Sequence, residues 1–143
     1  MSAAPEAVRL AGVETDAALA DLTEISSQIE TAAVFGTDGS LLASTFADEP
    51  PAARLVTTAR ELLEAAAASP GGDGRTLTQV EVALREGSVF VVREGELAVA
   101  ATTEAGPTAG LVLYDLRTCL RSLAPPAAES PAPRRRTKKT ADA

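Results

Sequence analysis

The chain has 143 residues, enough for one domain and a tail, and its 45% hydrophobic and 23% charged residues are typical of a folded globular protein. The formal net charge is −7, although five of the 13 basic residues lie within positions 134–139. The rest of the chain is therefore strongly acidic, which argues against wide contact with a nucleic-acid backbone.

Several kinds of catalytic chemistry are excluded by residues that the sequence lacks. It contains no histidine, which removes imidazole general bases and the usual zinc clusters. Its only lysines are Lys138 and Lys139, so no Gly-rich loop is followed by the lysine of a phosphate-binding P-loop. We therefore expect no enzymatic activity, no cofactor and no metal.

The single cysteine, Cys119, excludes an intramolecular disulfide and suits a reducing compartment. No apolar run approaches the roughly 18 residues that a membrane-spanning helix needs. The N-terminus has no basic segment followed by an apolar one, so no signal peptide is expected. These features predict a cytoplasmic protein, and the abundance of alanine and of arginine over lysine is typical of GC-rich bacteria.

The first predicted elements are a helix and a hairpin. In residues 1–14 the apolar side chains do not recur at a regular spacing, so this segment is expected to be flexible. From Thr15 or Asp16 a helix is predicted, because apolar residues recur at three- and four-residue steps. This stripe consists of Leu19, Leu22, Ile25 and Ile29. Strands are then predicted at 31–36 and 40–46, joined by a turn at Asp38-Gly39, a typical hairpin signal.

A second helix is predicted at about 51–68, because Pro50 and Pro51 suit a first helical turn and one face of the segment is apolar. Three strands follow, at 76–85, 88–93 and 96–102. In the first, apolar and polar residues alternate, whereas the other two are apolar on both faces.

A last helix is predicted at about 108–123, with Leu113, Leu116, Leu120 and Leu123 as its apolar stripe. Cys119 lies on or beside that stripe, which favours a buried, inert thiol over a reactive one. The Pro/Ala-rich and then basic segment 125–143 is expected to be disordered. Its basic run could contact an acidic partner weakly, but a solvated end is the simpler interpretation.

The element order α-β-β-α-β-β-β-α predicts a three-layer α/β/α sandwich around a five-stranded antiparallel sheet, formed by residues 15–124. One helix about 10 Å wide cannot cover five strands spaced about 4.8 Å apart, so the face under the middle helix stays partly uncovered. A second copy would cover that face and any open strand edge. The pattern therefore predicts a dimer.

The sequence resembles the roadblock (dynein light-chain) family, a profilin-like fold. The resemblance covers nearly all of residues 16–123 and is carried by IETAAVFGTDGSLLAST (29–45), RLVTTARELLEAA (54–66), LTQVEVALREGSVFVV (77–92), LAVAATTEAG (97–106) and GLVLYDLRTCLRSL (110–123). It implies a dimer in which the middle helix pairs with its twin and the following strand continues the sheet. It also implies a non-catalytic regulator or scaffold for a Ras-like small GTPase.

The residues that we expect at the dimer interface lie on the middle helix and the strand after it. They are Leu55, Val56, Ala59, Leu62, Leu63, Ala66, Val80, Val82 and Leu84. The expected partners are a second copy or a paralogue, and a Ras-like GTPase, with no membrane contact. Two other functions stay open: a structural adaptor without a nucleotide-linked partner, and a sensor domain that holds a small ligand.

Overall fold

The computed structural model describes residues 4–70 and 79–123, with side chains from residue 14 onward. Three helices and five strands follow one another in the predicted order. They are α1 (Ala4–Ile25), β1 (Ile29–Gly36), β2 (Leu41–Ser44), α2 (Glu49–Ala68), β3 (Gln79–Ala83), β4 (Gly87–Glu94), β5 (Leu97–Glu104) and α3 (Ala109–Arg121).

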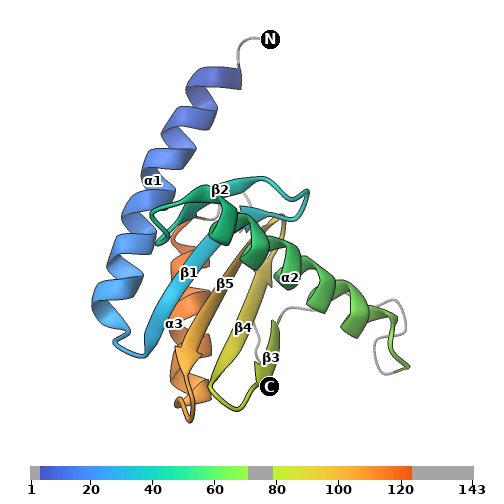
Figure 1. Cartoon of the computed structure of the whole chain (residues 1–143). Coiled ribbons are helices and arrows are strands. Elements are labelled where there is room, and N and C mark those ends of the chain that lie inside the picture. Colours follow the sequence, from blue (N-terminus) through green and yellow to red (C-terminus); the bar gives the residue numbers. More distant parts are fainter. Residues whose placement is uncertain (1–3, 71–78, 124–143) are drawn as a thin grey trace, which may run out of the picture.

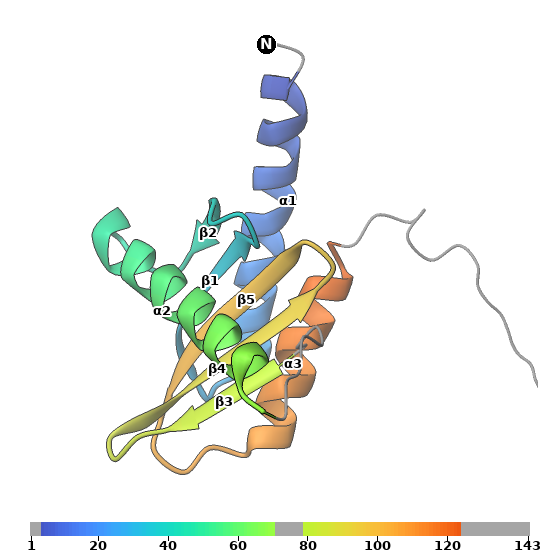
Figure 2. The ribbon, with the colours of Figure 1, turned by 90° about the vertical axis from the view of Figure 1, so that its right-hand side faces the viewer.

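The five strands form one sheet in the order β2-β1-β5-β4-β3, and every neighbouring pair is antiparallel. Helices α1 and α3 lie on one face and α2 crosses the other, as Figures 1 and 2 show. The predicted three-layer architecture is therefore confirmed. The central strands β1, β4 and β5 are those with long apolar runs, because both of their faces are covered by helices.

Two apolar cores lie on opposite sides of the sheet. The larger, under α1 and α3, contains Leu22, Phe90 and Leu116. The smaller, under α2, contains Phe35, Leu63 and neighbouring small residues. With only two large aromatic side chains fully buried, most of the buried area comes from valine, leucine and alanine.

The hairpin turn between β1 and β2 forms at Asp38-Gly39, as predicted. Gly39 adopts a positive φ of 100°, a conformation that glycine tolerates best. The carboxylate of Asp38 accepts hydrogen bonds from the backbone N–H of Ser40 at 3.0 Å and from its hydroxyl at 2.7 Å. These bonds, with a smaller contribution from the charge of Arg60, lower the pKa of Asp38.

Two expectations about the first helix, its starting residue and its buried stripe, are wrong. Helix α1 begins at Ala4, so residues 4–14 are helical where a flexible lead-in was expected; alanine, leucine, glutamate and arginine there favour a helix without any apolar stripe. Ile25 does not join the buried stripe, since 72% of it is exposed. The tail 125–143, and the start of the predicted strand at 76–78, lie outside the described residues.

Candidate interaction surface

Strand β3 forms one edge of the sheet, and in the described part of the chain it pairs only with β4. The pairing runs without a bulge from Gln79 opposite Val92 to Ala83 opposite Ser88. Beyond the strand, the N–H of Leu84 donates to the carbonyl of Gly87 at 2.7 Å. Hydrogen-bonding direction alternates along a strand, so the N–H and C=O groups of Gln79, Glu81 and Ala83 point away from β4.

The other edge strand, β2, offers a poorer template for a further strand. It has only four residues, and its pairing with β1 shifts register between Val34 and Phe35. Helix α1 also packs against it. Short length, irregular pairing and helical cover all protect a sheet edge, so β3 is the more accessible of the two edges.

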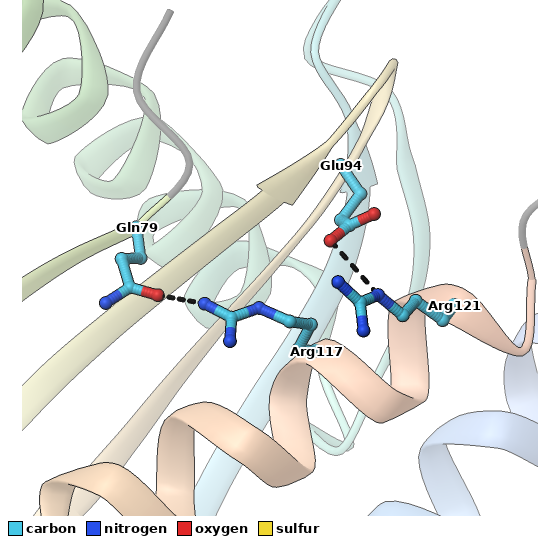
Figure 3. Close-up of polar contacts among 4 residues, drawn as sticks. All are labelled: Gln79, Glu94, Arg117 and Arg121. Carbon is cyan, nitrogen blue, oxygen red and sulfur yellow. Dashed lines mark hydrogen bonds and ion pairs between the residues drawn. The ribbon is translucent and has the colours of Figure 1, made fainter. Parts of the chain in front are cut away.

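Helix α3 helps to fix the position of β3. The guanidinium of Arg117 on α3 donates a hydrogen bond to the side-chain oxygen of Gln79, at the first residue of β3 (Figure 3). One turn further along α3, Arg121 forms an ion pair with Glu94 of β4, with a nitrogen–oxygen distance of 3.4 Å. Both contacts are exposed, so they orient the strand more than they stabilise the fold.

The sheet face under α2 is only partly covered. Val80, Val91, Ala100 and Ala33 form a row across four strands, and the last three are fully buried. The next row on the same face is only half-buried and consists of Val82, Val89, Thr102 and Thr31.

This second row, called the open row below, has a valine end at β3 and a threonine end at β1. The two threonine hydroxyls are hydrogen-bonded to each other at 2.5 Å. Thr31 and Thr102 were not among the residues predicted for the interface, although their hydroxyls are unusual in otherwise apolar strands. The open row is the uncovered surface that the width of a single helix had led us to expect.

The nine expected interface residues fall into two groups. Four are already buried between α2 and the sheet in a single chain: Leu55, Val56, Ala59 and Leu63. They cannot meet a second molecule directly without leaving that core, so their role is to hold α2 in place. The other five are half-buried or exposed: Leu62, Ala66, Val80, Val82 and Leu84. Of the nine expected residues, these five are the ones with surface available to a second molecule.

Leu84 is notable among these five because it is a large apolar side chain with 57% of its surface exposed. It follows Val80 and Val82 at two-residue steps, and side chains at such steps lie on the same face of a strand. The β3 edge therefore combines outward-pointing backbone groups with an apolar row on the α2 side. Such an edge fits another β-strand.

On the opposite side of the molecule, a cavity of about 240 Å³ lies between α1 and α3. Ile25, Tyr114 and Cys119 line it. Tyr114 is exposed, whereas Cys119 is buried, and this burial raises the pKa of the thiol to about 11. The thiol is therefore protonated near neutral pH and unsuited to nucleophilic chemistry.

Within residues 4–70 and 79–123, no three acidic or cysteine side chains gather in a way that could hold a metal ion. No helix in this described part is long and apolar enough to cross a membrane.

The chain is similar in structure to Roadblock/LC7 domains. One from Streptomyces avermitilis matches with a TM-score of 0.67 and 21% identity, over 76% of this chain and 92% of that one. The gliding protein MglB from Thermus thermophilus gives a TM-score of 0.66 at 13% identity, and the match covers 79% of this chain and 87% of that one. An MglB with a tetrameric arrangement gives 0.67 at 14% identity, over the same shares. No protein-family model and no curated protein matches the sequence.

Proposed function

We propose that the protein is a non-catalytic homodimeric regulator or scaffold that binds a Ras-like small GTPase in the cytoplasm. The observation that carries this proposal is the open β3 edge, which adjoins the half-covered sheet face under α2. The Roadblock/LC7 fold, at the low identities found, supports the architecture alone. The GTPase partner rests on the sequence resemblance described above.

The dimer follows from the cost of leaving this surface in water. An exposed strand edge and an apolar row are liabilities in a monomer, since they template non-specific pairing. A second copy presents the same edge and the same apolar row, so one contact covers both molecules. One protein of the same fold, an MglB, has a tetrameric arrangement, which agrees with self-association on this scaffold.

A regulator of this kind needs no catalytic side chain of its own. It binds the GTPase and changes the population of its switch-loop conformations, and this requires only different affinities for the GTP-bound and GDP-bound states. The absence of histidine from the sequence is compatible with that role. The acidic body would then contribute long-range attraction to a basic surface on the partner.

Two measurements test the proposal. Light scattering on the purified full chain should give the mass of a dimer. Titration calorimetry with Ras-like GTPases encoded in the same genome, each loaded with GDP or with a non-hydrolysable GTP analogue, should show binding that depends on the nucleotide. Nucleotide-independent binding, or none to any such GTPase, would favour the structural adaptor, and a monomer at high concentration would overturn the dimer.

A further inference from the structure

A cavity of about 840 Å³ lies where the β1–β2 turn, the β4–β5 turn and the end of α3 meet. The apolar part of its wall is formed by leucines: Leu42, Leu97, Leu120 and Leu123. All four also belong to the core under α1 and α3 or pack against it, so the cavity lies at one end of that core. A hollow of this size with a partly apolar wall is typical of sites that bind a ligand or a short peptide segment.

The remaining wall of the cavity is acidic. Asp38, Glu94 and Glu96 line it, and none of the other described lining residues is basic. Glu94 shares its charge with Arg121 in the ion pair at the end of α3 (Figure 3). The other two carboxylates form no ion pair within the described residues, so the wall has a negative charge that is not balanced locally.

Two further arginines lie near this wall without pairing with its carboxylates. The hydrogen bonds from Ser40 are the main cause that lowers the pKa of Asp38, and the charge of Arg60 is the smallest. On the β4–β5 hairpin, Nε of Arg93 donates to the carbonyl oxygen of Gly95 at 3.3 Å. The wall can therefore accept additional cations.

The tail of the same chain starts at this cavity. Leu123, the last described residue, lines it, and α3 has ended at Arg121. The sequence continues with mostly proline and alanine over 124–133 and then with the basic run RRRTKK at 134–139. Ten residues span up to about 33–36 Å when extended, so the basic run can return to a wall that Leu123 itself lines.

We propose that this tail docks on the cavity of its own chain, with the basic run at 134–139 against Asp38 and Glu96 and the prolines and alanines over the leucines. The run supplies five cations, and hydrogen bonds between an arginine and a carboxylate are among the stronger ones. The contact needs little intrinsic affinity, because a short tether gives an effective concentration in the millimolar range. A basic partner of the protein would have to displace the docked tail. The inference does not rest on the dimer or on the GTPase.

A second acidic cavity on the same molecule is a poorer site for the tail. It has a volume of about 310 Å³, and its carboxylates are Glu30 and Glu104. No leucine is among its described lining residues, so proline and alanine find little apolar surface there. Glu96 and Glu104 flank opposite ends of β5, roughly 26 Å apart at about 3.3 Å per residue. This second cavity therefore provides an internal control.

Paramagnetic relaxation enhancement in the full chain tests the contact. A nitroxide is attached to the variant Thr137→Cys, in the basic run. The wild-type chain treated with the same reagent is the matched control, because its one thiol, Cys119, is buried. The backbone N–H signals of Thr37 and Gly95 report on the proposed site, and that of Ala105 reports on the second acidic cavity.

We expect the enhancement at Thr37 and Gly95 to be at least roughly threefold stronger than at Ala105, and to disappear at about 1 M salt, where the Debye length is about 3 Å. Glu96→Lys should weaken the enhancement at Gly95 at least roughly threefold, because it replaces an attraction by a repulsion. Glu104→Lys makes the same change of charge at the other end of β5 and should weaken it less than roughly 1.5-fold.

Absence of the enhancement at Thr37 and Gly95, or equal weakening by the two lysine substitutions, would overturn the docking. A mixture of nitroxide-labelled chains with unlabelled, nitrogen-15-enriched chains identifies the source of the tail. Enhancement at the cavity in this mixture would place the tail on a second copy and overturn docking within one chain, and its absence would support it. The dimer and the GTPase are tested by separate measurements, so failure of this inference leaves the proposed function intact.

Discussion

At the scale of single residues, Cys119 shows how burial determines chemistry. Its side chain on α3 is 6% exposed, and its thiol points to the carbonyl oxygen of Ala18 on α1 at 3.8 Å. Burial is the main cause that raises the pKa of this thiol to about 11, and the negative charge of Asp21 adds to it. The sequence-based expectation of a buried thiol is confirmed, and the group acts as a packing residue between the two helices.

This pKa predicts a loss of stability at high pH. The unfolded chain ionises its thiol at an ordinary pKa of about 8.5, and the folded chain does so only near 11. The stabilisation is therefore complete below about pH 8.5 and is lost as the pH rises toward 11. Between pH 8 and pH 11, the difference in unfolding free energy between the wild type and Cys119→Ala should fall by about 3 kcal/mol.

Urea denaturation of both proteins across this pH range measures the effect. The alanine variant serves as the control, because it shares every other titrating group with the wild type. A difference that stays constant with pH would contradict a buried thiol. In addition, the native thiol should react slowly with a maleimide at pH 7.5 and rapidly after unfolding.

At the scale of elements, the sequence predicted the type and order of the helices and strands well. It predicted less well which face of a helix is buried. Leu19, Leu22 and Ile25 follow one another at three-residue steps. A helix advances about 100° per residue, so two such steps rotate the stripe by about 120°. The structure instead buries Thr15 and Ser26 in line with Leu19, although both are polar. Because these two buried residues are polar, the spacing of apolar residues alone does not reveal the buried face of the helix.

The β1–β2 turn gives a prediction at the same scale. Gly39 has a positive φ, and a methyl group added to it would lie 2.7 Å from Nη1 of Arg60 on α2. We expect Gly39→Ala to cost about 1–2 kcal/mol through backbone strain and displacement of that arginine. Gly110 is the matched control: it lies near the start of α3 with open space around it, so Gly110→Ala should stabilise the protein by about 0.5 kcal/mol.

Chemical denaturation of the two variants beside the wild type provides the test. Equal effects of both substitutions would show that the turn geometry does not matter to stability. If Gly39→Ala proved neutral while Gly110→Ala was stabilising, the positive φ at the turn would be contradicted.

At the scale of the whole molecule, the long apolar runs at 88–93 and 96–102 indicated strands that are covered on both faces, and the alternation at 76–85 indicated a strand with one polar side. The location of the interface was less accessible to sequence analysis. One helical periodicity marks both the residues that α2 buries and those that it could offer to a partner. Leu55 and Ala59 lie on the same apolar face as Leu62, and only the structure separates the buried from the half-exposed.

The interface proposed for β3 gives a whole-molecule prediction that uses two leucines of similar exposure. Leu84 is 57% exposed beside the β3 edge, and Leu111 is 51% exposed on α3, on the other face of the sheet. Each is changed to aspartate. If two copies join through β3, Leu84→Asp places a charge against the partner's apolar row, which is costly to desolvate. The dissociation constant of the dimer should then rise more than roughly tenfold, about 1.4 kcal/mol or more.

Leu111→Asp removes a similar area of exposed leucine but lies on α3, on the other face of the sheet, so the dissociation constant of this variant should change by less than about twofold. Analytical ultracentrifugation over a range of concentrations measures both constants, and circular dichroism verifies that both variants fold. Equal weakening by the two variants would indicate a general effect of added negative charge on an already acidic protein. Weakening by Leu111→Asp alone would place the contact on the α1–α3 side and leave the β3 edge without a partner.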